Sequence, residues 1–168
     1  LLRQRAYIDV VIPRGGAGLI RRIVEESRIP VIETGSGVVH IYVDKEADPA
    51  KVVPIVINAK TQRPSVCNAA ETLLVHREAV DTILPDVIDA LIKAGVHLYG
   101  DEAIQRLTAA AMPATEKSWY TEYNDLIMNC RVVDSVEEAI DHINRYGTKH
   151  SECIITENKV TADAFMRD

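Results

Sequence analysis

Short apolar runs alternate with helix-forming stretches along almost all of this 168-residue chain. Runs of β-branched residues closed by proline or glycine are typical of strands, and apolar residues three or four positions apart are typical of helices. The alternation therefore predicts an α/β fold with a mostly parallel sheet covered by helices. We expect strands at 7–12, 29–32, 39–43, 72–76, 96–99, 126–133 and 152–156, helices at 19–27, 48–60, 77–94, 101–110, 135–145 and 159–166, and an irregular segment at 111–120.

Composition removes several classes of function. The net charge of −6 argues against a nucleic-acid surface, which needs a basic stripe, and no apolar run approaches the roughly 18 residues of a membrane span. The first five residues are too polar for a signal peptide. Three widely spaced cysteines offer neither a disulfide framework nor a metal site, so no metal is expected. These features together predict a reduced, cytoplasmic setting.

One cysteine stands out by its position in the predicted topology. Cys67 lies in the turn between the helix at 48–60 and the strand at 72–76, and connecting turns often carry reactive side chains. Lys60 and Arg63 lie close in sequence, and positive charge favours the thiolate, which attacks carbonyl carbon. The alternative is that Cys67 is a small buried apolar residue, the more common environment of a free cysteine.

The segment around this cysteine, Thr61-Gln-Arg-Pro-Ser-Val-Cys-Asn68, resembles the active-site loop of the γ-glutamyl phosphate reductases, also called glutamate-5-semialdehyde dehydrogenases. These enzymes are part of the aldehyde dehydrogenase superfamily. Further similar segments follow the same order and extend the resemblance over nearly all of the chain. They are Ile12–Gly16, Gly35–Asp44 and Tyr146–Ser151.

The resemblance implies an aldehyde dehydrogenase-like fold and two domains. Residues 1–33 would be the C-terminal part of an NADP-binding domain, and 34–168 a catalytic domain truncated at its C-terminus, so we expect a fragment that is inactive alone. The implied reaction is the NADPH-dependent reduction of L-glutamyl 5-phosphate to L-glutamate 5-semialdehyde, the second step of proline biosynthesis. A homo-oligomer and coupling to glutamate 5-kinase are also expected.

The resemblance also assigns roles to two glutamates. Glu122 matches the carboxylate that holds the nicotinamide ribose, although Asn124-Asp-Leu126 replaces the usual Phe-Gly-Pro and puts the loop shape in doubt. Glu33 lies 34 positions before Cys67 by subtraction, the register of the general base in hydrolytic aldehyde dehydrogenases. Because an acyl phosphate reductase activates no water, Glu33 need not be catalytic. If the chain oxidised an aldehyde instead, Glu33 would be essential.

Other candidates carry weaker patterns. Gly15 and Gly16 precede a predicted helix, so the loop could place a cofactor phosphate at a helix N-terminus, or could form an ordinary turn. Lys149 and His150 lie in a polar loop where they could bind the phosphate or carboxylate of the substrate. A folded, non-catalytic interaction module is the remaining alternative to an enzyme.

Overall fold

A computed structural model describes residues 1–33 and 35–167 of the chain. They form two compact units, Leu1–Ser36 and Gly37–Asp168. Among the described residues, no helix combines the length and the apolar character needed to cross a membrane.

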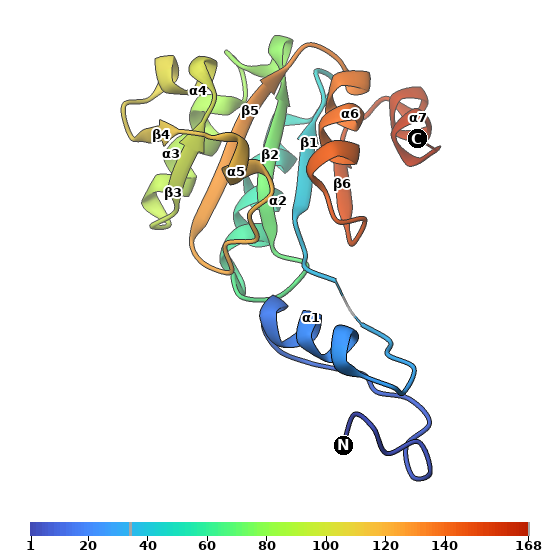
Figure 1. Cartoon of the computed structure of the whole chain (residues 1–168). Coiled ribbons are helices and arrows are strands. Elements are labelled where there is room, and N and C mark those ends of the chain that lie inside the picture. The colour runs from blue at the N-terminus through green and yellow to red at the C-terminus, as the bar shows by residue number, and fades with distance from the viewer. Residues whose placement is uncertain (34, 168) are drawn as a thin grey trace. The chain divides into compact units, whose positions relative to one another are not determined.

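The larger unit is built on a six-stranded parallel sheet with the strand order β4-β3-β5-β2-β1-β6 (Figure 1). The strands are β1 (Val39–Val43), β2 (Ala70–His76), β3 (His97–Gly100), β4 (Ala111–Pro113), β5 (Ile127–Val133) and β6 (Glu152–Ile155). The helices are α2 (Pro49–Thr61), η1 (Arg77–Ala79), α3 (Leu84–Lys93), α4 (Glu102–Leu107), α5 (Glu116–Trp119), α6 (Val136–Tyr146) and α7 (Lys159–Arg167). The expected α/β architecture, a mostly parallel sheet covered by helices, is thereby confirmed.

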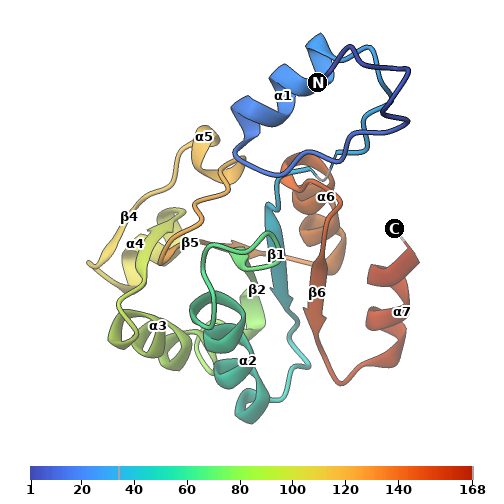
Figure 2. The ribbon, with the colours of Figure 1, turned by 90° about the horizontal axis from the view of Figure 1, so that it is seen from below.

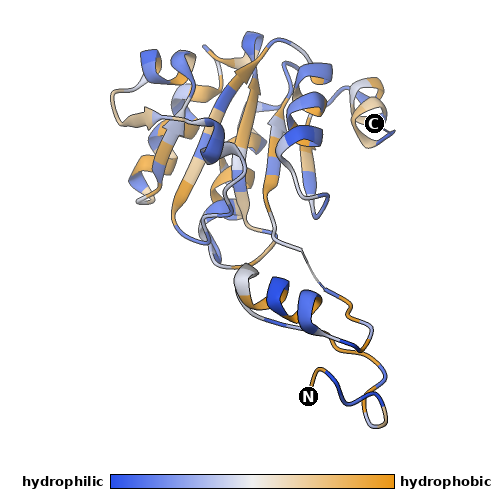
Figure 3. Ribbon diagram, in the orientation of Figure 1, coloured by the Kyte–Doolittle hydropathy of each residue, from blue (hydrophilic) through white to orange (hydrophobic). Residues whose placement is uncertain are grey.

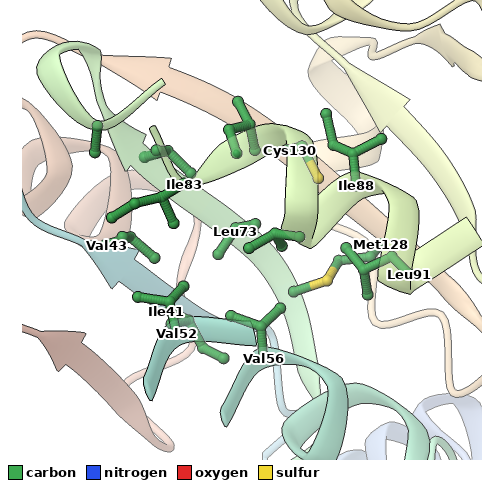
Figure 4. Close-up of a cluster of buried hydrophobic side chains, with 14 of the residues drawn as sticks. Ile41, Val43, Val52, Val56, Leu73, Ile83, Ile88, Leu91, Met128 and Cys130 are labelled. Atoms are coloured by element: carbon green, nitrogen blue, oxygen red, sulfur yellow. The ribbon is translucent and has the colours of Figure 1, made fainter. Parts of the chain in front are cut away.

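Helices cover both faces of the sheet, as is visible when the molecule is seen from below (Figure 2). On the α2 and α3 face, alternate strand residues such as Ile41 and Leu73 pack against Val56 and Leu91 (Figure 4). The opposite face packs Tyr42 and its neighbours against α6 and α7. Because both faces are covered, all residues of β1 and β2 are buried. Hydrophobic colours accordingly run along the central strands (Figure 3).

Two expected segments of this unit take a different form. The single helix expected over 77–94 is divided into η1 and α3, because Pro85 lies in the first turn of α3, where proline favours a helix start. The segment 111–120, expected to be irregular, contains the edge strand β4 and the short helix α5. Thr115 and Ser118 form a capping box at the start of α5.

Among its described residues, the smaller unit contains one helix, α1 (Ala17–Glu26), close to the range expected from the sequence. The strands expected at 7–12 and 29–32 are wrong, since an isolated parallel bridge between Val11 and Val31 is what forms there. Tyr7 and Ile12 are largely exposed. β-Branched residues stabilise a strand mainly by packing on a buried face of a sheet. The segment at 7–12 has little buried surface on which they could pack.

Candidate active site

Four loops meet at the end of the sheet where the parallel strands begin, which we call its amino-terminal edge. The segments at 37–38, 61–69, 120–126 and 147–151 precede β1, β2, β5 and β6, which are neighbours in the strand order. Figure 2 views this edge. Ligands of open parallel sheets usually bind at the carboxyl ends of the strands. The candidate residues of this unit lie instead at the amino ends of the strands.

Gly37 is the point at which these loops come together. A Cβ atom added to Gly37 would lie 1.6 Å from the carbonyl oxygen of Cys67, so only glycine allows the two backbones to approach this closely. The Gly37 N–H donates to Glu122 Oε1 at 2.8 Å. The next residue, Val38, donates its N–H to Thr148 Oγ1 at 3.1 Å. The segment before β1 therefore contacts the three other loops.

Cys67 is exposed in the turn between α2 and β2. The turn is closed by backbone hydrogen bonds from Val66 to Arg63 and from Ala69 to Val66. No acceptor in the described part of the chain takes the Cys67 N–H itself. The sulfur is accessible to a reagent, and the alternative of a buried apolar cysteine does not apply.

The other two thiols have less favourable surroundings. Cys130 is fully buried on β5, and burial together with the nearby Asp101 raises the pKa of its thiol to about 12. Cys153 is exposed on β6, but desolvation by its neighbours raises its pKa as well. Since the thiolate is the reactive form, both residues are disfavoured as nucleophiles.

Lys60 does not have the role that the sequence favoured. The residue is fully buried near the end of α2, and its Nζ donates to Glu71 Oε2 at 2.8 Å. Burial lowers the pKa of Lys60 and raises that of Glu71, and the ion pair opposes both shifts. The Lys60 charge is thus matched by a carboxylate, while Arg63 is exposed on the cysteine turn.

Glu122 lies half-buried in the loop before β5, with its carboxylate directed at Gly37. Its Oε2 has no partner among the residues that the structure describes. A carboxylate with one anchored oxygen and one available oxygen suits an acceptor for a hydroxyl group. Nearby Asn124 has a φ of 55°, a left-handed conformation that asparagine tolerates better than most residues.

Lys149 and His150 line a cavity of about 390 Å³ between α6, α7 and the loop at 147–151. Both side chains are exposed, and His150 Nδ1 lies 2.9 Å from Ser151 Oγ. The wall combines these polar groups with the apolar side chains of Ile143 and Phe165. The same loop supplies Thr148, which contacts the segment before β1.

Gly15, Gly16 and Glu33 are in the Leu1–Ser36 unit. Gly16 is the N-cap of α1 without a side-chain cap, and Gly15 has a φ of 149°. Exposed Glu33 lines a cavity of about 310 Å³ in this unit, together with Arg21 and Glu25. Thr34, the first residue of the expected catalytic domain, lies outside the described residues.

Sequence reasoning missed two features of the site: the close approach at Gly37 and the buried Lys60–Glu71 pair. The available signal for the pair was a glutamate next to the apolar run at 72–76 and a lysine on the buried side of α2. No group of three or more metal-ligating side chains was found among residues 1–33 and 35–167.

Comparison with known proteins identifies relatives of this chain. No family model matches the chain. It is 57% identical to the γ-glutamyl phosphate reductase of Moorella thermoacetica over 166 residues, 99% of this chain and 40% of the relative. The crystal structure of the γ-glutamyl phosphate reductase of Thermotoga maritima superimposes with a TM-score of 0.94 at 50% identity, covering 98% of this chain and 40% of that one. The resemblance to γ-glutamyl phosphate reductases is confirmed.

More distant structures extend the similarity of fold. The acetylating aldehyde dehydrogenase of Geobacillus thermoglucosidasius matches 95% of this chain with a TM-score of 0.72 at 20% identity. The fold is therefore aldehyde dehydrogenase-like, as the sequence resemblance implied. The chain spans about 40% of the length of the γ-glutamyl phosphate reductases that it matches.

Proposed function

We propose that this chain carries the cysteine-bearing part of an enzyme that reduces L-glutamyl 5-phosphate to L-glutamate 5-semialdehyde with NADPH. This reaction is the second step of proline biosynthesis. The observation that carries the proposal is the exposed Cys67, whose carbonyl packs against Gly37 while the same glycine holds Glu122. The identity of 57% to a γ-glutamyl phosphate reductase supports the choice of substrate.

The Cys67 thiolate would attack the acyl carbon of the substrate. A carbon–sulfur bond forms, the bond from carbon to the phosphate oxygen breaks, and phosphate leaves to give a thioester. The Cys67 N–H has no acceptor among the described residues. It would donate to the oxyanion of the tetrahedral intermediate, and one such donor typically contributes about 10²–10³ in rate. Reduction of the thioester and collapse of the thiohemiacetal would release the aldehyde and regenerate the thiol.

NADPH would supply the hydride for this reduction. Glu122 would accept hydrogen bonds from the nicotinamide ribose through Oε2, while Gly37 fixes Oε1. In the other unit, the uncapped first turn of α1 after Gly15 and Gly16 presents backbone N–H groups suited to a phosphate. Residues 1–33 would accordingly be the end of the NADP-binding domain, and 34–168 the catalytic domain.

Lys149 and His150 would bind an anionic group of the substrate. A cavity of about 390 Å³ beside them has room for a small amino-acid substrate, and their loop is joined through Thr148 to the segment that carries Gly37. The proposal also includes a cytoplasmic homo-oligomer that is coupled functionally to glutamate 5-kinase.

The test of the proposal is the reactivity and the necessity of Cys67 in the complete protein. Alkylation with iodoacetamide, followed by peptide mass spectrometry, should modify Cys67 before Cys130 and Cys153. Cys67→Ser should abolish reduction of glutamyl phosphate and leave the thermal unfolding curve unchanged, since an alkoxide forms far less readily than a thiolate. Cys153→Ser is the matched control and should stay active. Retained turnover in Cys67→Ser, or equal alkylation of all three thiols, would refute the assignment.

A further inference from the structure

The ion pair between Lys60 and Glu71 is unusual because both side chains are almost completely shielded from solvent. Lys60 is 0% exposed and Glu71 is 1% exposed. Removing two charges from water is costly, and replacing such a pair by apolar side chains of similar volume is often neutral or stabilising. Stability alone therefore gives no strong reason for charges at these two positions.

The pair lies at the base of the loop that carries Cys67. Lys60 is the last residue but one of α2, and Glu71 is the second residue of β2. Their contact at 2.8 Å joins the two ends of the intervening turn. The turn has few other internal bonds, namely two backbone hydrogen bonds within 63–69. The ion pair thus fixes where the cysteine turn leaves the helix and enters the sheet.

The second oxygen of Glu71 reaches a different loop. Oε1 accepts the N–H of Asn124 at 3.2 Å, and the nearby backbone of Tyr123 also acts to lower the pKa of this carboxyl group. These two residues directly follow Glu122. Asn124 has its left-handed φ of 55° at this point, so the loop turns where Glu71 holds it. One buried carboxylate consequently connects the cysteine turn to the loop that carries Glu122.

We propose that Glu71, oriented by Lys60, is a positioning residue that fixes the Glu122 loop relative to the Cys67 turn. This inference rests on the proposed function: Glu71 would set the distance between the thioester on Cys67 and the cofactor ribose held by Glu122. A neutral or apolar residue could fill the same volume, but a methionine could not accept the Asn124 N–H. The Lys60 ammonium holds the other oxygen of the carboxylate and so orients it towards that N–H.

Two double variants separate this role from simple packing. Lys60→Met/Glu71→Met removes the charges and the acceptor, whereas Lys60→Met/Glu71→Gln removes the charges and keeps an amide oxygen for the Asn124 N–H. Hydrogen exchange measured by mass spectrometry on the full-length protein should accelerate about tenfold or more over 121–126 in the Met/Met variant, as local opening becomes easier. The Met/Gln variant should stay near the parent.

In steady-state kinetics the Lys60→Met/Glu71→Met variant should raise the KM for NADPH and lower kcat, with a smaller change in Lys60→Met/Glu71→Gln. Equal exchange over 121–126 in the parent and both variants would overturn the positioning role. The hydrogen-exchange result does not depend on turnover. If exchange changes as expected but no variant, parent included, reduces glutamyl phosphate, the proposed function fails and the positioning role stands.

Discussion

At the scale of single residues, Glu122 combines one carboxylate oxygen held by a backbone N–H with one that has no partner among the described residues. One oxygen of Glu122 is held by Gly37, so loss of the side chain removes a loop contact in addition to the proposed contact with the cofactor. Side chains that position a reacting group contribute through geometry, and a small displacement can cost about 10² in rate.

For Glu122→Ala in the complete enzyme, we therefore expect NADPH use to weaken and turnover to fall by about 10², with formation of the Cys67 thioester intact. Trapping the acyl-enzyme with glutamyl phosphate, alongside NADPH kinetics, measures the two steps separately. Glu116→Ala provides a control on an exposed carboxylate outside the site, on α5. A parallel fall in acylation would mean that Glu122 supports the cysteine turn and not the cofactor.

His142 is a buried titratable residue on the α6 face of the sheet. Arg131 can only donate, so its contact of 2.8 Å makes Nδ1 of His142 an acceptor. Burial, with His40, Arg131 and Arg145 nearby, lowers the pKa of His142 from 6.5 to about 3. The unfolded chain thus binds the proton more readily, and the stability that His142 contributes is complete above pH 6.5 and is lost as the pH falls towards 3.

The expected slope from this single group is at most about 1.4 kcal/mol per pH unit between these two values. His142→Asn retains an acceptor for Arg131 and should flatten the fall in stability between pH 6 and pH 4. Urea unfolding at several pH values measures how the free energy of unfolding depends on pH. Exposed His97→Asn is the control for replacing a histidine by asparagine. Parallel pH profiles for His142→Asn and the parent would contradict the shift.

At the scale of elements, the contact between the segment before β1 and the cysteine turn predicts a severe effect of Gly37→Ala. The new Cβ would meet the Cys67 carbonyl at 1.6 Å, and the obstacle is backbone, so the turn itself must move. We expect destabilisation of about 1–3 kcal/mol, typical of overpacking, together with a changed rate of Cys67 alkylation.

Gly35→Ala is the matched control, because an added Cβ there meets nothing within 4 Å. Thermal unfolding and alkylation kinetics of both variants would be compared. A Gly37→Ala protein with parental stability and parental alkylation would show that the turn accommodates the methyl group freely.

Elements whose signal is local could be predicted from the sequence. The side chains of Asp48 and Ser135 cap α2 and α6, a role that aspartate and serine favour, and Gly95 ends α3 with a φ of 79°. The division of the helix after β2 was missed although Pro85 was visible, because helical apolar spacing continues through it. The strand expected at 7–12 failed because strand formation depends on partners far along the chain.

The candidate site was predictable in the parts that have a local sequence signal. Cys67 could be placed in a turn from its neighbours alone. The assignment of Lys60 to the sulfur was not supported, because sequence proximity cannot reveal that Glu71, 11 positions away by subtraction, faces the lysine inside the core. The approach of Gly37 to Cys67 depends on the pairing of β1 with β2, and a lone glycine carries no signal for it.

At the scale of the whole molecule, Glu33 and Cys67 belong to different units. Since reduction of an acyl phosphate releases phosphate without attack by water, Glu33→Gln in the complete enzyme should leave turnover nearly unchanged. Steady-state rates with glutamyl phosphate measure this, and Glu25→Gln is a control from the same cavity. A loss of about 10² or more, the scale of general acid–base catalysis, would instead indicate hydrolytic aldehyde dehydrogenase chemistry.

The strand order has a consequence for how the chain acquires its structure during synthesis. β1 pairs on one side with β2 and on the other with β6, where His40 lies opposite Glu152. A nascent chain must wait for more than 100 further residues, by subtraction, before β1 gains its second neighbour. Until then β1 is an unpaired edge, the kind of surface on which chains aggregate, and such long-range closure slows folding. The Gly37 segment, which leads into β1, reaches Thr148 of the last loop only at this late stage.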